Sequence, residues 1–496
     1  MNRYISTLFL CSAALLCNAG LNNSSLIPPF KTDAQVKLEK TADGKSESPD
    51  WVKGLIMTTA RVDAVSTDQT IKGMEPYLDH LAEMGVNGLW VTPPLNGGNG
   101  YGNFGIHTMN PLLLGETDPV KQWQVLKNFV DAAHKRNIRV FFDVVTWGVT
   151  KHEGGAPLLK EKPEWFSQYY DRYAGWFFNW DNAELNEWFA SRLVEWALLT
   201  GADGFRCDCS PFHAEYGAYR TAKKRLRDMG RKIILISEFG CARRNVFDFD
   251  QVSMMKDFRT PRWQGVTFLE KNIVDEVKSG GELIARDDET ALRGRKRFYT
   301  FMLSCHDSGE YTAKGSPIVF GYQAIFSPFI PLWYVGEEWN NPKAHFVDYY
   351  VKRDKIKRKT WRLTNNFVDW KAKDKNRAFF EQVKKMIRIR RERPEIFEFF
   401  PDNNTKTNIC AVQTKPATKL QSYARYSNGK AVIIVPNYSD KLLKTTVSIP
   451  FAEAGLEKGR EYTVTDLLSD KKIANGKIPD FSITLNPGEL GVFEVK

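Results

Sequence analysis

The sequence predicts an α/β protein: a (β/α)8 TIM barrel with a short inserted excursion after the third strand, followed by a C-terminal all-β sandwich. Two observations indicate this fold class. Between residues 51 and 335, short apolar runs ending at a polar residue alternate with stretches of helical spacing, as in buried parallel strands covered by helices. After about residue 400, short alternating strands separated by turn signals replace that pattern.

The chain has 496 residues, too many for one ordinary core, so we expect two domains. Residues 1–19 are typical of a secretory signal peptide with a small-residue cleavage site, which predicts a secreted or periplasmic protein. Lipoprotein anchoring through Cys17 is the alternative, but Leu16 stands where that motif has a small residue. The polar residues 20–50 are expected to form a linker or mobile arm. No later stretch is long and apolar enough to span a membrane.

Eight apolar runs are expected to form the strands of a barrel at residues 51–400. They are 53–58, 85–93, 138–145, 202–208, 233–238, 252–255, 301–307 and 329–335. The tryptophan- and tyrosine-rich segment 146–181 is predicted to be a short inserted subdomain, and residues 401–496 to be the sandwich. In a closed barrel, the C-terminal strand ends meet at one mouth.

Three of the expected strands end in an acidic residue: Asp208, Glu238 and Asp307. Carboxylates that converge at a barrel mouth are costly to desolvate, which favours chemistry over packing. Arg206 lies two residues before Asp208 on the same strand face and can supply the positive charge that keeps Asp208 ionised. The alternative interpretation is a buried ion network without a chemical role.

The formal net charge is +11, and a dense basic run occurs at residues 384–391. Apolar residues at helical spacing accompany this run, which indicates a solvated helix face, and no nucleic-acid motif supports a nucleic-acid partner. The five cysteines after residue 19 form an odd, sparse set, which favours small semi-buried fillers over a disulfide framework or a metal cluster. We therefore expect no cofactor and no metal, and the oligomeric state is open.

Five segments together resemble glycoside hydrolase family 13, the α-amylase family, over roughly residues 51–496. In chain order they are Asp143–Val145, Gly204–Asp208, Glu238–Gly240, Cys305–Ser308 and Ile330–Glu338. Each segment alone is weak evidence, but all five occur in the family's order at expected strand ends.

The resemblance implies a retaining mechanism, in which two carboxyl groups about 5–5.5 Å apart act as nucleophile and as acid then base. By resemblance, Asp208 is the nucleophile and Glu238 the acid/base residue. Asp307 would bind sugar hydroxyls with His306 beside it. Tyr101 resembles the family's aromatic platform under the sugar.

By the same resemblance, Asp143, in the family's first conserved region, and Arg206 join the substrate-binding residues. The predicted function is a retaining α-glycosidase that hydrolyses α-glucosidic bonds in oligo- or polysaccharides. Two alternatives stay open: a transglycosylase or isomerase using the same intermediate, and a non-catalytic carbohydrate-binding protein.

The chain departs from the family pattern at Trp147 and Gly148, where an asparagine and a histidine usually follow the first conserved region. The asparagine often helps bind calcium, so we expect no calcium at that position, because Trp147 offers no oxygen ligand. The histidine usually contacts the sugar's primary hydroxyl, so recognition there is expected to differ. Pro211 and Phe212 replace a Lys-His pair that often follows the nucleophile.

Overall fold

The computed structural model describes most of the chain after residue 47. The described residues are 48–95, 109–150, 155–170, 175–208, 216–239, 247–252, 273–275, 277, 300–306, 317–340, 367–398 and 408–496. The expected signal peptide and nearly all of the expected arm lie outside them.

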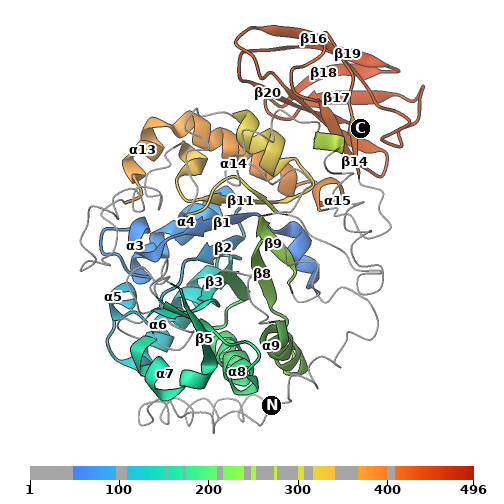
Figure 1. The fold of residues 1–496 in the computed structure, drawn as a ribbon. Helices are drawn as coiled ribbons and strands as arrows, with labels where there is room; N and C mark the ends of the chain where they lie inside the picture. Colours follow the sequence, from blue (N-terminus) through green and yellow to red (C-terminus); the bar gives the residue numbers. More distant parts are fainter. Residues whose placement is uncertain are drawn as a thin grey trace.

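Eight parallel strands form the first and largest sheet, in the order β10-β11-β1-β2-β3-β7-β8-β9. The strands are β1 (Met57–Ala60), β2 (Gly88–Val91), β3 (Arg139–Val145), β7 (Gly204–Asp208), β8 (Ile234–Phe239), β9 (Phe249–Val252), β10 (Thr300–Met302) and β11 (Ile330–Tyr334). β9 and β10, at the two ends of this order, contact each other, so the sheet curls into a barrel (Figure 1). The predicted (β/α)8 fold is confirmed.

Helices surround the barrel. They are α3 (Val62–Val65), α4 (Glu75–Met84), α5 (Pro111–Leu114), α6 (Pro119–His134), α8 (Ala183–Thr200), α9 (Tyr216–Asp228), α13 (Trp370–Lys375), α14 (Arg377–Arg391) and α15 (Pro394–Phe397). Local sequence fixes several helix ends. The Asp118 carboxylate caps α6 by accepting the amides of Val120 and Lys121, with Pro119 in the first turn. α8 ends at Gly201, whose left-handed conformation suits a glycine.

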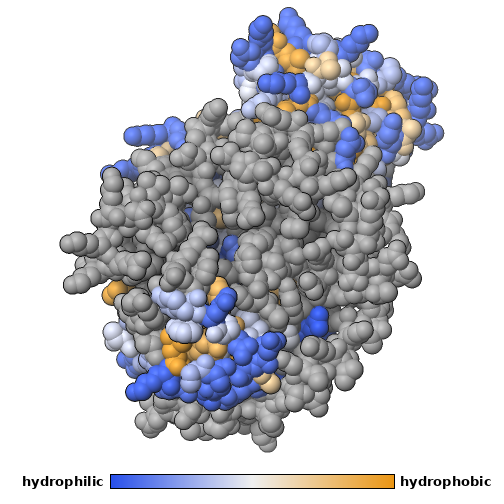
Figure 2. Space-filling view, in the orientation of Figure 1, coloured by the Kyte–Doolittle hydropathy of each residue, from blue (hydrophilic) through white to orange (hydrophobic). Residues whose placement is uncertain are grey.

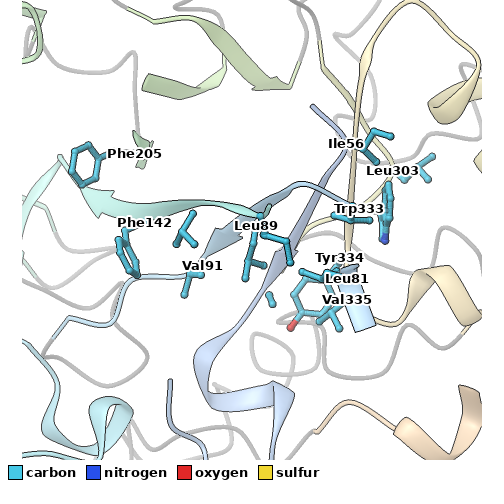
Figure 3. Packing of buried hydrophobic residues seen from close by; sticks show 14 of the residues in the cluster. Ile56, Leu81, Leu89, Val91, Phe142, Phe205, Leu303, Trp333, Tyr334 and Val335 are labelled. Carbon is cyan, nitrogen blue, oxygen red and sulfur yellow. The ribbon is translucent and has the colours of Figure 1, made fainter. Parts of the chain in front are cut away.

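Strand alternation divides the buried residues of the barrel into two layers. Phe141, Ile234 and Ile236 pack in the barrel interior. Residues of opposite parity, such as Leu89 and Phe142, belong to a separate apolar cluster that also contains residues of the helices, and Figure 3 shows part of it. The site residues follow the same alternation. Their position along each strand therefore determines which of their side chains point into the barrel.

Three expected strands differ from those observed. The first, predicted at 53–58, is β1 at Met57–Ala60, because the 3-10 turn η2 (Asp50–Gly54) occupies the start of the predicted range. The sixth strand, predicted at 252–255, is wrong in position: β9 spans Phe249–Val252, and residues 253–255 lie outside the described part. β9 contains Asp250 and Gln251, so it has no apolar run to mark it. The seventh strand, predicted to reach residue 307, is β10 and ends at Met302. Beyond it, the Ser304 hydroxyl rather than a backbone carbonyl accepts the Tyr334 amide (3.0 Å).

A small antiparallel sheet follows β3, in the segment 146–181 where a short inserted excursion was predicted. Its strand order is β4-β6-β5. The elements are β4 (Gly148–Thr150), α7 (Gly155–Glu161), the 3-10 turn η5 (Pro163–Trp165), β5 (Phe166–Tyr170) and β6 (Gly175–Phe178). We refer to this sheet with α7 and η5 as the excursion.

The C-terminal region is an antiparallel sandwich of a six-stranded sheet, β12-β14-β15-β20-β17-β18, and a three-stranded sheet, β13-β16-β19. The strands are β12 (Ile409–Ala411), β13 (Thr414–Lys415), β14 (Tyr423–Ser427), β15 (Lys430–Pro436), β16 (Leu443–Ser448), β17 (Tyr462–Asp466), β18 (Lys471–Gly476), β19 (Asp480–Leu485) and β20 (Leu490–Val495). The predicted all-β sandwich is confirmed.

The central strands β15 and β20 of the larger sandwich sheet are buried on both faces. Ile433 and Val435 of β15 pack in the sandwich's own core. Their neighbours Val432 and Ile434 belong to the same apolar cluster as Met386 of α14, on the barrel. The barrel and the sandwich therefore share a core.

Two buried arginines lie at this junction and are held by backbone carbonyl groups. Arg390 donates to the carbonyl oxygens of Ile325, Ser327 and Phe329 at 2.5, 3.2 and 3.0 Å. Arg425 donates to the carbonyls of Phe326 (3.3 Å) and Ile396 (3.0 Å) and to Asn408 Oδ1 (2.8 Å). Burial lowers the pKa of Arg390 to about 10 and that of Arg425 to about 9, so both stay charged at neutral pH.

Apart from the buried Arg390, the basic run of α14 lies at the surface, as predicted. Lys384 contacts Glu83 (2.9 Å) and Lys385 contacts Asp470 (2.6 Å), while Val383 and Met386 are buried. Within the described parts of the chain, every helix is too short or too polar to cross a bilayer.

We expect Arg425→Leu to destabilise the protein by about 3 kcal/mol or more, because several buried oxygen acceptors lose their donor at once. The measurement is the shift of the thermal and urea unfolding midpoints. Lys444→Leu, at an exposed position of β16, is the control and should change stability by less than about 0.5 kcal/mol. Equal stability of both variants would contradict a structural role for Arg425.

Candidate active site

Strand register brings the predicted site residues of three neighbouring strands to one face. In the β3–β7 ladder, Asp143 lies opposite Arg206, and in the β7–β8 ladder Arg206 lies opposite Ile236. Because side chains alternate, Asp208 and Glu238, each two residues further along, point to the same inner face. They stand at the C-terminal ends of β7 and β8, where a barrel mouth is formed.

Arg206 is the shared cation of this cluster. Its Nη1 contacts Asp208 Oδ1 at 2.6 Å and Asp143 Oδ2 at 3.1 Å. Its Nη2 lies 3.3 Å from Glu238 Oε1. One guanidinium therefore brings three carboxyl groups together, two of which were predicted to be the reacting pair.

Burial separates the members of the cluster into a closed base and an accessible rim. The side chains of Arg206 and Asp143 are both 0% exposed. Those of Asp208 and Glu238 keep 13% and 12% exposure. The fully buried Arg206–Asp143 pair lies deeper in the barrel, and the two carboxyl groups nearer the mouth are the ones that a ligand can reach.

Trp90 of β2 completes the base of the site. Its indole Nε1 donates to Asp143 Oδ2 (3.1 Å), and the Arg206 guanidinium lies 4.9 Å from its ring centroid. The His306 ring meets the Trp90 ring edge-on at 5.4 Å. His306 is thus brought into the cluster, whereas sequence reasoning missed Trp90. Strand alternation could have indicated Trp90, because it lies at an inward-facing position of β2, directly before the strand ends.

Thr146, also missed, donates its hydroxyl to the backbone carbonyl of Asp208 and thereby ties the end of β7 to the segment after β3. The predicted residues Asp307 and Tyr101 lie outside the described residues.

The excursion occupies the space beside Gly148, the position at which the family usually has a histidine. A Cβ at Gly148 would lie 1.9 Å from the carbonyl oxygen of Trp176, and one at Gly175 would lie 2.5 Å from that of Val149. β4 and β6 therefore pair at a distance that only glycine permits at these points. The Trp147 ring is buried and meets Phe177 edge-on at 6.1 Å.

No group of three or more histidine, cysteine, aspartate or glutamate side chains among the described residues is placed to hold a metal ion. Cys207, on the opposite strand parity to Arg206, packs between the sheet and the helices. Cys305, by contrast, packs in the barrel interior.

Two curated relatives align with most of this chain. The α-amylase MalA of Haloarcula japonica is 22% identical over 445 residues, which cover 84% of this chain and 58% of the relative. Neopullulanase 2 of Thermoactinomyces vulgaris is 20% identical over 458 residues, which cover 84% of this chain and 69% of the relative. The chain thus spans less than two thirds of the length of the first relative.

Solved structures share the fold. The noncanonic maltogenic α-amylase AmyB of Thermotoga neapolitana superposes with a TM-score of 0.62 at 18% identity, covering 89% of this chain and 99% of its own. An Anoxybacillus α-amylase gives a TM-score of 0.65 at 15% identity, covering 89% of this chain and 98% of its own. Residues 418–495 match the model of the α-galactosidase C-terminal β-sandwich domain.

We expect Gly148→Ala to disrupt the pairing of β4 with β6, because the added methyl group would overlap the Trp176 carbonyl. The expected cost is about 2 kcal/mol or more, measured as a lower unfolding midpoint together with faster proteolysis of the excursion. Gly230→Ala is a matched control: Gly230 also has a positive φ (79°), but its Cβ would meet nothing within 4 Å. Equal losses in the two variants would show that backbone conformation, not the close approach, is responsible.

Proposed function

We propose that this chain is a retaining α-glycosidase. The proposal starts from the resemblance of the chain to the α-amylase family, glycoside hydrolase family 13, a resemblance that the relatives named above confirm. The enzyme's substrates would be oligo- or polysaccharides with α-glucosidic bonds. The observation that carries this proposal is the contact of one buried guanidinium, Arg206, with both Asp208 and Glu238. This contact gathers at the barrel mouth the two carboxyl groups that the retaining mechanism requires.

The unequal contacts of Arg206 suit unequal roles for the two carboxyl groups. Nη1 lies 2.6 Å from Asp208, whereas Nη2 lies 3.3 Å from Glu238. The closer contact orients the carboxylate assigned as nucleophile, and the longer one leaves Glu238 the freer of the two carboxyl groups to exchange a proton with the leaving oxygen.

In the first step, an Asp208 oxygen forms a bond to the anomeric carbon as the bond from that carbon to the leaving oxygen breaks. Glu238 gives its proton to the leaving oxygen. In the second step, Glu238 takes a proton from water, and the resulting oxygen nucleophile displaces Asp208 from the anomeric carbon. Two inversions restore the α configuration.

The transglycosylase and isomerase alternatives differ from hydrolysis only in the nucleophile that attacks the covalent intermediate in the second step. A sugar hydroxyl in place of water gives transglycosylation, and an internal hydroxyl gives isomerisation. Incubation with maltooligosaccharides, followed by product analysis, separates them, because hydrolysis yields only shorter chains and exchange yields longer ones. Tight binding without any product would favour the non-catalytic carbohydrate-binding alternative.

We also propose that the protein acts outside the cytoplasm, in the periplasm or after secretion. The support is the signal-like composition of residues 1–19. The N-terminal sequence of the mature protein tests this, because cleavage after Ala19 gives a chain that begins at Gly20.

Asp208→Asn should lower kcat on maltooligosaccharides by several orders of magnitude, because the nearly isosteric amide cannot form the covalent intermediate. The unfolding midpoint shows whether the fold is kept. Asp131→Asn, on the exposed face of α6, is the matched control and should retain parent turnover. Turnover of Asp208→Asn within about tenfold of the parent would exclude Asp208 as nucleophile.

Glu238→Gln should slow substrates with poor leaving groups far more than activated aryl glycosides, because only the former need the proton. The covalent intermediate should then accumulate on Asp208, since water has no base. Azide needs no base, so it should restore turnover and give an α-configured glycosyl azide, identified by NMR. A β-configured product, or no effect of azide, would contradict the assignment of Glu238 or the retaining mechanism.

A further inference from the structure

Two exposed aromatic rings lie side by side on the excursion. Tyr169 of β5 and Trp176 of β6 keep 37% and 36% of their surface exposed. They are directly opposite in the β5–β6 ladder, with ring centroids 5.6 Å apart and ring planes tilted by 62°. Among the described residues, no other aromatic side chain reaches this exposure.

The neighbouring aromatic pair is more buried, whereas the Tyr169 and Trp176 rings meet edge-on and still keep about a third of their surface exposed. Phe166 and Phe178, the preceding opposed pair of the same two strands, are stacked at 5.4 Å. Phe178 is 2% exposed and meets Trp180 edge-on at 5.5 Å. The Tyr169–Trp176 pair lies further along the strands, beyond this buried contact, and presents ring surface to solvent. Large aromatic side chains left in water at the surface are typical of ligand contacts.

The strand connections link this pair to the mouth of the barrel. Trp176 lies opposite Val149 of β4 as well as Tyr169 of β5, so one row of residues crosses the excursion. β4 begins three residues after Val145, the register partner of Asp208. Figure 1 places β5 beside α7 and α8, at the far end of the molecule from the sandwich. A chain bound at this pair would therefore lie on the excursion and not on the sandwich.

The size and composition of the surface indicate a sugar rather than a protein. Ser167 and Gln168, the two residues of β5 that precede Tyr169, are polar and exposed. Figure 2 shows apolar and hydrophilic residues mixed on the described surface around α7 and β5. A stable protein interface buries about 800 Å² on each partner, far more than two rings offer. Two aromatic faces with a hydroxyl and an indole N–H at their edges match the C–H faces and hydroxyl groups of two sugar units.

We propose that Tyr169 and Trp176 form an aromatic platform that binds α-glucan chains outside the cluster around Arg206. The tilt of 62° between the rings favours an α-linked chain, whose successive units turn relative to each other, over a flat β-linked chain that suits coplanar rings. The choice of an α-glucan as ligand rests on the proposed function. The platform holds the polymer near the mouth and raises its local concentration there.

Binding is measured with the full chain carrying Asp208→Asn, so that no substrate is consumed. Maltoheptaose and soluble amylose are titrated by calorimetry and affinity electrophoresis, and cellohexaose serves as the β-linked comparison. In this background, Tyr169→Ala/Trp176→Ala should weaken amylose binding about tenfold or more, since each ring loses a stacking contact. Trp176→Phe, which keeps a ring, should retain most of the affinity. Leu442→Ala, an exposed apolar position of the sandwich, should bind as the parent does.

The outcomes distinguish the platform from the proposed function. Unchanged amylose affinity in the double alanine variant, or no binding of maltoheptaose and amylose by the parent background, overturns the platform. Equal binding of cellohexaose overturns the assignment to α-linked chains. Cleavage is assayed separately with Asp208 intact: a protein that binds amylose through the two rings but cleaves no α-glucosidic bond keeps the platform and refutes the glycosidase. Thermal unfolding midpoints that match the parent's show that the variants are folded.

Discussion

The contact of Arg206 with three carboxyl groups is the interaction on which the candidate site depends. Arg206 and Asp143 are both fully buried, and either charge alone in that environment would be strongly destabilising. Their pairing is fixed by the register of β3 against β7, in which they stand opposite each other. A slip of one residue would turn Arg206 toward the helices and leave Asp143 without its cation. The geometry of Asp208 and Glu238 therefore follows from strand pairing rather than from loop conformation.

Strand periodicity accounts for most of what could be predicted about the site. The period of two places Arg206 and Asp208 on one face, and the same reasoning on the next strand adds Glu238. The indole of Trp90 escaped prediction because a tryptophan within an apolar run looks the same whether it packs or donates to Asp143. The position of β9 was predicted wrongly because polar residues interrupt it, so that no apolar run marks the strand. Asp307 and Tyr101 stay predictions, because they lie outside the described residues.

The excursion shows a second limit of sequence patterns. Gly148 and Gly175 lie on different strands and matter only because their backbones meet, a contact that no local pattern indicates. The close pairing begins directly after β3 and fills the space that a side chain at Gly148 would need. Sugar recognition by a histidine at this position is therefore sterically excluded in this arrangement. In this chain, the sugar contacts that a histidine at this position would make must come from other side chains. The excursion, whose close strand pairing leaves no room for that histidine, carries exposed aromatic rings of its own.

The sandwich contacts the barrel at the segment that leads into β11, an inner strand of the barrel sheet. Arg390 donates to the carbonyl oxygens of Ile325, Ser327 and Phe329, the segment that leads directly into β11. Arg425, from the sandwich, donates to the carbonyl of Phe326 in the same segment. β11 pairs with both β1 and β10, and His306 follows β10. These hydrogen bonds connect the segment before β11 to α14 and to the sandwich at once. The barrel and the sandwich are therefore joined by buried polar contacts as well as by their shared apolar core.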